Sequence, residues 1–152
     1  MKIEQRITQL GLKLQECPQA AAQYVPYIVS GKYIFTAGQT PKIGTELKYI
    51  GKVGRDIEIA EAYKAAELCA LRCVSVLKAS ISDLDKIKRI IKVVGYVNST
   101  EDFTLHPKVI NGASNVLEAI FGDKGKHARV AIGVNSLPGG APVELELIAE
   151  IQ

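Results

Sequence analysis

The stretch GKHARVAIGVNSLPGGAPVELELIAE, residues 125–150, decides the fold that we predict for this chain. It contains two runs of alternating residues, 128–135 and 143–151, which have the period of β-strands. Residues 136–142 between these runs are rich in glycine and proline, as turns are. The pattern therefore predicts that the chain ends in two strands joined as a hairpin.

Arg129 and Glu144 stand among the small and apolar residues of these two strands. Because side chains alternate across a strand, one apolar set is predicted to face the core: Val130, Ile132, Val134, Val143, Leu145 and Leu147. Arg129 and Glu144 would then share the opposite face of the sheet. A guanidinium and a carboxylate held on stiff strands favour a site for an anion and a water molecule.

The rest of the chain predicts an α+β domain that spans residues 1–152. Apolar spacing indicates helices over residues 2–10, 56–78 and 107–120, with Asp56 as N-cap of the second. Residues 24–29, 32–37, 47–50 and 84–98 read as strands. We expect a mixed sheet with the two long helices on one face. The other face would be left uncovered, so we infer a homo-oligomer.

The hairpin register places a constraint on the two charged residues. Arg129 would pair near residue 149, which leaves Glu144 about 16 Å away along the strand, at about 3.3 Å per residue. One pocket could hold both residues more easily if they came from different subunits.

Composition limits the classes of function. The net charge is only +3, tryptophan is absent and no dense basic stripe occurs, so nucleic-acid binding is not expected. No apolar run approaches the roughly 20 residues of a membrane span, and the N-terminus has no signal-peptide pattern. The chain has three cysteines, and an odd number argues against a disulfide scaffold. Cys69 and Cys73 fall on one helix face without further ligands, which predicts reduced thiols and no metal site. Reduced thiols in turn predict a cytoplasmic protein.

The C-terminal stretch resembles the signature of the RidA family, also called the YjgF/YER057c/UK114 family. That signature is an arginine, an alternating strand, a Leu-Pro turn and a V-E-[IVL]-E strand, which match Arg129, Leu137–Pro138 and residues 143–146. The segment YIFTAGQTP, residues 33–41, resembles the family's strand ending in [ST]-G-Q-x-P. Other segments resemble a divergent subgroup often labelled endoribonuclease L-PSP.

The resemblance implies a chorismate-mutase-like fold and a homotrimer with three clefts between subunits. It also implies hydrolysis of reactive 2-imino acids to 2-oxo acids and ammonia, without a cofactor. Arg129 takes the place of the arginine that binds the substrate carboxylate, and Glu144 that of the acid that positions the attacking water. The alternatives are a non-catalytic trimer that binds a small carboxylate or acts as a regulator and, less favoured, an endoribonuclease using His106 and His127.

Further pocket residues follow from the same resemblance. Gly38 and Gln39 match the stretch that lines the pocket floor. The family's pocket tyrosine corresponds to Tyr27, with Tyr24 as the alternative, and its asparagine to Asn111, with Asn115 as the alternative. Two positions differ from the deaminases: Ala131 replaces a cysteine and Ala37 replaces a serine.

Overall fold

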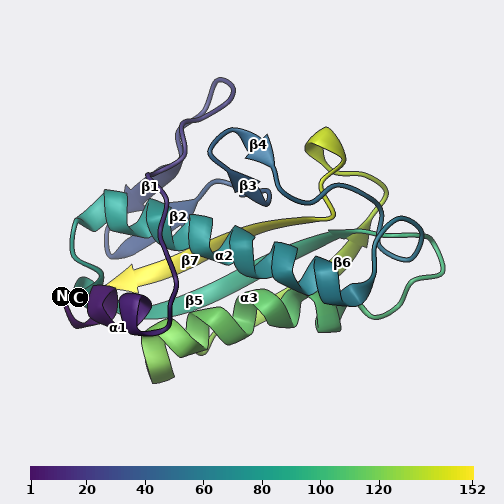
Figure 1. Ribbon diagram of the computed structural model, residues 1–152. Coiled ribbons are helices and arrows are strands. Elements are labelled where there is room, and N and C mark those ends of the chain that lie inside the picture. Colours follow the sequence, from purple (N-terminus) through teal and green to yellow (C-terminus); the bar gives the residue numbers. More distant parts are fainter.

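A five-stranded mixed sheet forms one layer of the molecule, seen in a computed structural model that describes residues 1–152 (Figure 1). Its strands lie in the order β1-β2-β7-β5-β6. The bounds are β1 Tyr27–Ser30, β2 Tyr33–Thr36, β5 Ile87–Asn98, β6 Ala128–Val134 and β7 Val143–Ile151. β6 runs parallel to β5, and the other pairs are antiparallel. Two further strands, β3 (Lys42–Ile43) and β4 (Glu46–Leu47), form a separate ribbon.

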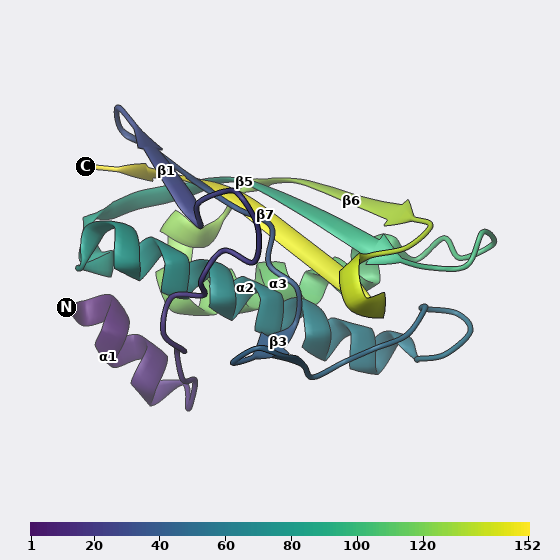
Figure 2. The ribbon, with the colours of Figure 1, turned by 90° about the horizontal axis from the view of Figure 1, so that it is seen from above.

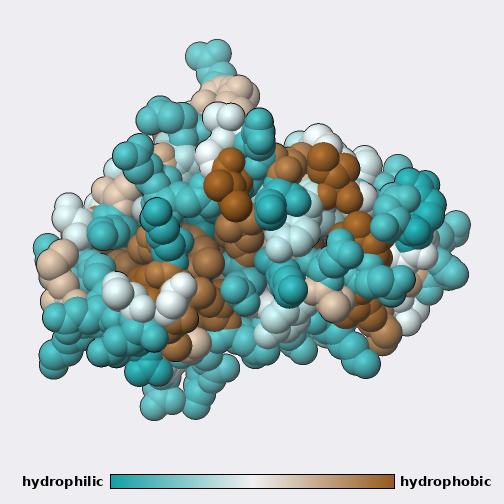
Figure 3. Space-filling model, in the orientation of Figure 1, coloured by the Kyte–Doolittle hydropathy of each residue, from teal (hydrophilic) through white to brown (hydrophobic).

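The helices form the second layer, on one side of the sheet (Figure 2). The long helices α2 (Ile59–Ile81) and α3 (His106–Phe121) lie side by side against the strands, and α1 (Lys2–Gln9) packs at one end. The surface on the helix side is mostly hydrophilic, with smaller apolar areas between the polar ones (Figure 3). This arrangement confirms the predicted α+β class, with a mixed sheet and two long helices on one face. None of the helices has the length and apolar character needed to cross a membrane.

Close contacts at two glycines fix α3 between α2 and β5. Gly112 lies against the backbone carbonyl of Tyr63 in α2, so that a Cβ at this position would overlap the carbonyl oxygen. Gly95 in β5 receives the side chain of Ile110, whose Cδ1 would be 2.5 Å from an added Cβ. The missing side chains allow α3 to approach both neighbours, and this position decides which residues of α3 meet β6.

Several predicted boundaries were wrong by a few residues. α2 begins at Ile59, because Asp56 does not cap it: its carboxylate accepts the backbone N–H of Lys52 at 2.8 Å within a tight turn. The helix continues to Ile81 and ends where Ser82 adopts φ 64°. Cys69 and Cys73 are buried in α2 without a disulfide, as predicted.

The strands predicted in the N-terminal third are shorter than expected. The run 24–29 becomes a strand only from Tyr27, and the run 47–50 contributes only Leu47, paired in the ribbon with Lys42. The remaining residues of these runs lie in loops. Short apolar runs without a continuous partner strand do not form a ladder, whatever their propensity.

The predicted C-terminal hairpin is wrong, because β5 lies between β6 and β7. β5 pairs with β6 from Lys92 opposite Ala128 onwards, and with β7 on its other side. Parallel strands need a crossover connection, and α3 supplies it in a β5–α3–β6 unit. The turn-rich segment therefore crosses the end of β5 and does not close a hairpin.

The predicted facing of β6 is also wrong, although that of β7 is correct. Val130 and Ile132 are 37% and 41% exposed and lie on the uncovered face, whereas Arg129 points to α3. Val143, Leu145 and Leu147 are buried under the helices, as predicted. Alternation identified the apolar set of β6 correctly, but an apolar set also suits a face that another subunit covers.

Replacement of Gly112 by alanine tests the contact between α2 and α3. Helix propensity alone predicts that Gly112→Ala stabilises the protein by about 0.5–1 kcal/mol. Because the new Cβ would meet the Tyr63 carbonyl, we expect a loss of about 1–3 kcal/mol in the free energy of unfolding, measured by urea denaturation. Glu118→Ala on the exposed side of α3 should change it by less than about 0.5 kcal/mol. A stabilised Gly112→Ala variant would contradict the close packing.

Candidate functional site

Arg129 is held against α3 by three acceptors, which we call the Arg129 clamp. Its Nη1 donates to Asn111 Oδ1 at 2.9 Å and to Ser114 Oγ at 3.1 Å. Its Nη2 donates to the carbonyl oxygen of Pro107 at 3.4 Å. A guanidinium has five N–H groups, so the Nε–H and one Nη2–H have no partner within the chain. The clamp fixes the side chain and leaves two donors for a ligand.

His127 contacts Ser114 of the clamp. Its Nδ1 lies 2.6 Å from the carbonyl oxygen of Gly125, and its Nε2 lies 2.9 Å from Ser114 Oγ. A carbonyl can only accept, so Nδ1 donates and Nε2 accepts the hydroxyl proton of Ser114. Ser114 Oγ is then free to accept from Arg129. This tautomer gives the hydrogen bonds of His127, Ser114 and Arg129 one consistent direction.

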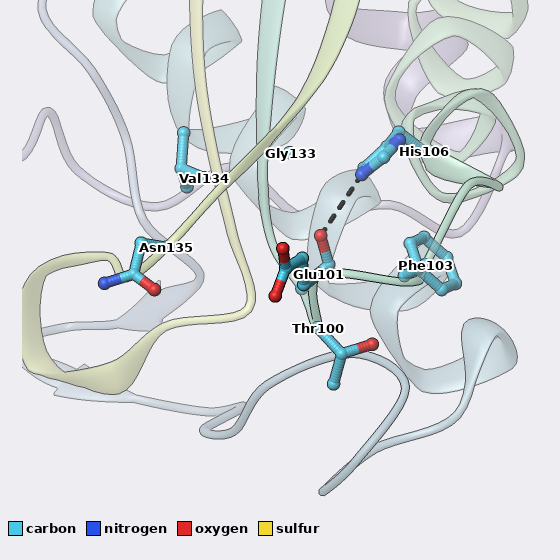
Figure 4. Close-up of a pocket in the computed structure, with 8 residues that line it drawn as sticks. Thr100, Glu101, Phe103, His106, Gly133, Val134 and Asn135 are labelled. Carbon is cyan, nitrogen blue, oxygen red and sulfur yellow. Dashed lines mark hydrogen bonds between the residues drawn. The ribbon is translucent and has the colours of Figure 1, made fainter.

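A polar pocket of about 400 Å³ lies beyond the clamp, between the end of β6 and the start of α3 (Figure 4). Ser99 Oγ and His106 Nε2 are 3.1 Å apart at its wall, and the Phe103 ring meets the imidazole edge-on. Gly133 faces His106 Nε2 so closely that a Cβ would overlap it. Arg129 and Gly133 lie on the same face of β6, so the pocket and the clamp are on the same side of this strand.

A second cluster forms around Gly38 and Glu144. The carboxylate of Glu144 lies over Gly38, and a Cβ there would be 2.5 Å from Oε1. Gln39 pairs its backbone with Leu145, donating at 2.8 Å and accepting at 3.0 Å, which fixes this loop beside β7. Only glycine leaves room for the carboxylate at this position.

The electrostatic setting of Glu144 disfavours its charge. Partial burial, and secondly the nearby Glu146, raise the pKa of Glu144. Glu146 itself accepts a 2.6 Å hydrogen bond from the phenol of Tyr96, which raises the pKa of Tyr96 to about 12. A carboxyl group with a raised pKa is better suited to exchange protons with a substrate near neutral pH.

The two clusters lie apart within one chain. Arg129 faces α3 on an edge strand, whereas Glu144 lies on the uncovered face of β7, with β5 between the two strands. Of the residues predicted from the sequence, Asn111 binds Arg129 and Gly38 lies against Glu144. Gln39 pairs with Leu145, the neighbour of Glu144 in β7.

The two residues of each alternative pair, Tyr27 or Tyr24 and Asn111 or Asn115, lie in different surroundings. Tyr27 begins β1 and packs against the core, whereas Tyr24 lines a small cavity together with Gly38 and Gln39. Asn115 donates to the hydroxyl of Tyr63 and does not contact Arg129. Asn111 is therefore the asparagine of the clamp.

The sequence did not predict Ser114 as a partner of Arg129, and it suggested His127 only for the endoribonuclease alternative. Asn111 and Ser114 are three residues apart, a spacing that places two side chains on one helix face. That spacing could have indicated two hydrogen-bond partners for one arginine. Nothing in the sequence places His127 behind Ser114, because the contact depends on the turn after α3.

The acidic residues Glu4, Asp83 and Asp85 gather closely enough for a metal ion. Asp85 accepts the backbone N–H groups of Lys2 and Ile3, and Glu4 accepts that of Leu84. Their oxygens therefore cap α1 and the neighbouring turn.

Comparisons with known proteins place the chain in a family. The family model described as "YjgF/chorismate_mutase-like, putative endoribonuclease" matches residues 4–151. The chain belongs to this family. The match spans nearly the whole chain, so it includes the helices and the N-terminal part as well as the C-terminal strands.

Individual relatives agree over almost their full length. Protein TCP17 of Trypanosoma cruzi is 38% identical over 151 residues, which cover 99% of this chain and 94% of that protein. The structure of Atu1372 from Agrobacterium tumefaciens, of unknown function, is 43% identical with a TM-score of 0.91, covering 99% and 92% of the two chains. A "putative endoribonuclease" from Shewanella oneidensis is 34% identical with a TM-score of 0.94, covering 98% and 99%.

The raised pKa of Glu144 predicts a dependence of stability on pH. The folded protein holds this proton to higher pH than the unfolded chain, so ionisation of Glu144 destabilises the fold as pH rises above its unfolded pKa. Glu144→Gln should therefore raise the free energy of unfolding near pH 7, and this gain should vanish below about pH 4. Urea denaturation at both pH values, with the exposed Glu118→Gln as control, measures the difference. An equal effect at both pH values would contradict a raised pKa of Glu144 in the folded protein.

Proposed function

We propose that the protein hydrolyses reactive 2-imino acids to 2-oxo acids and ammonia, in clefts between the copies of a homotrimer. In this proposal the Arg129 clamp of one copy binds the carboxylate of the substrate. Glu144 of a neighbouring copy, whose carboxylate lies over Gly38 of its own chain, positions and deprotonates the attacking water.

The Arg129 clamp carries this proposal. The two free donors, Nε–H and one Nη2–H, suit the two oxygens of a carboxylate, which a guanidinium can bind in parallel hydrogen bonds. Because Asn111 and Ser114 already hold the guanidinium, little conformational freedom is lost when a ligand binds. No acidic side chain forms an ion pair with Arg129, so its charge is available.

The uncovered face of the sheet supports a site between copies. This face carries exposed apolar side chains on both sides of the Glu144 strand: Tyr33, Phe35, Val130 and Ile132. Exposed apolar side chains on a sheet favour contact with another protein surface. If a second copy covers it, Glu144 comes to lie at the seam between subunits, where Arg129 of the edge strand β6 can reach it.

The reaction needs few groups. The carboxylate of the substrate is held by Arg129, and water adds to the imine carbon while Glu144 takes one of its protons. The same carboxyl group then returns that proton to the nitrogen, which gives a carbinolamine. A second transfer through this carboxyl group moves the proton of the new hydroxyl group to the nitrogen, so that the carbon–nitrogen bond breaks, ammonia leaves and the 2-oxo acid is formed. The raised pKa of Glu144 favours both transfers near neutral pH.

The second candidate is a trimer that binds a small carboxylate without turnover. Ala131, on the same face of β6 as Arg129, and Ala37, beside Gly38, carry no functional group where the deaminases have a thiol and a hydroxyl. The clamp would still bind a carboxylate in such a protein. Saturable thermal stabilisation by a 2-oxo acid, without release of ammonia from any imine, would favour this candidate.

Arg129→Ala tests the function. An amino-acid oxidase generates the imine, and the rate of ammonia release above the spontaneous rate is measured. Loss of two charge-assisted hydrogen bonds should reduce kcat/KM by roughly 100-fold or more. Arg129→Lys should recover little of it, because an ammonium cannot form the parallel pair.

The exposed Arg55 provides the matched control, and Arg55→Ala should leave the rate unchanged. Full activity of Arg129→Ala would contradict the mechanism. Absence of turnover in the wild-type protein, with ligand-dependent stabilisation lost in Arg129→Ala, would favour the binding protein.

A further inference from the structure

Arg72, in the middle of α2, is a buried cation without an acidic partner. Its side chain is only 6% exposed. The Nε and Nη1 groups donate to neutral acceptors: the side-chain oxygens of Gln39 and Gln15 at 3.4 Å, and the carbonyl oxygens of Lys42 at 3.0 Å and Gly44 at 3.5 Å. None of the four ion pairs of the structure includes Arg72. A buried charge without a counter-charge is costly, so a compensating anion would be strongly favoured.

The Nη2 of Arg72 has no hydrogen-bond partner within the chain. Glu4 Oε2 is the one fully buried polar side-chain atom that lacks a hydrogen-bond partner. The unpartnered Nη2 of Arg72 is therefore not fully buried. Arg72 lines a small cavity of about 60 Å³ between α2, the loop after β2 and the segment 18–26. The unpaired end of the guanidinium is thus reached from this cavity.

The rest of the lining also suits an anion. Lys42 also lines the cavity, and no aspartate or glutamate does. The hydroxyl of Tyr24 accepts the backbone N–H of Ala21 at 3.4 Å, which leaves its proton free to donate. Thr40 adds another hydroxyl. The lining residues thus include two basic residues and two hydroxyl-bearing residues, but no acidic one.

We propose that this cavity, here called the Arg72 cavity, is a binding site for a small carboxylate. Both N–H groups of the Nη2 atom lack a partner and can donate charge-assisted hydrogen bonds to carboxylate oxygens. At about 60 Å³ the cavity accommodates a carboxylate group and little more, so the remainder of a larger acid would extend outwards past Tyr24.

The Arg72 cavity is separate from the Arg129 clamp and does not rest on the proposed deaminase activity. It lies on the helix side of the loop Gly38–Gln39–Thr40, whereas Glu144 contacts Gly38 on the other side. A carboxylate bound to Arg72 would join the segment 18–26 to this loop. Occupancy of the cavity would therefore stabilise the loop on which Glu144 rests.

A titration with sodium formate at constant ionic strength, followed by amide NMR shifts, tests the site. We expect saturable shifts in residues 38–40 and 19–24. Lys42→Gln removes one lining charge but keeps the backbone carbonyl that Arg72 binds, and should weaken formate binding several-fold. Lys48→Gln, an exposed lysine outside the cavity, is the matched control and should bind as the wild type does. Arg72→Gln should abolish the shifts; if this variant fails to fold, the comparison of the two lysine variants decides.

Three outcomes would overturn the proposal. Shifts that do not saturate, or that are equal in Lys42→Gln and Lys48→Gln, would show that the cavity holds only water. Tighter binding of inorganic phosphate than of formate would exclude a site built for a carboxylate. Loss of the formate shifts in Arg129→Ala would assign the binding to the Arg129 clamp, whereas their retention, with or without imine turnover, keeps the two sites independent.

Discussion

The central position of β5 is the constraint on which the rest of the structure depends. Because β5 pairs in parallel with β6, the chain between them must cross over the sheet, and α3 is that crossover. α3 then runs along β6, fixed by the contacts at Gly95 and Gly112, and offers Asn111 and Ser114 to Arg129. On its other side β5 pairs with β7, which carries Glu144. The position of β5 thus brings α3 to Arg129 and also separates the Arg129 clamp from the carboxylate of Glu144.

This separation gives a chemical reason for the oligomer that we propose. A carboxylate anchor and a water-activating acid that lie on opposite faces of one sheet cannot act on one small substrate within a single chain. The apolar side chains of the uncovered face, among them Phe35 and Ile132, favour a neighbouring copy at the position where Glu144 lies. Burial of Glu144 and its neighbour Glu146 on this face already raises the pKa of Glu144. The proposed site therefore needs the assembly in order to be complete.

The sequence predicted the elements well and their pairing less well. The period of α2 and the alternation of β7 identified both elements, because each has one face in the core. The hairpin prediction failed because adjacent strands with a turn-rich connection resemble a hairpin whether or not another strand lies between them. The strand–helix–strand order of β5, α3 and β6 was the available signal for a parallel pair. The facing of β6 could not be predicted from one chain, since apolar side chains such as Val130 and Ile132 suit a core face and a contact face equally well.

The most direct test of a site shared between copies is to mix two inactive variants. Arg129→Ala and Glu144→Gln chains are unfolded together in equal amounts and refolded, and ammonia release from an oxidase-generated imine is measured. If each site takes Arg129 from one copy and Glu144 from the next, about a quarter of the sites regain both residues, and about a quarter of the wild-type activity returns. No activity beyond that of the separately refolded variants would contradict a site built from two subunits.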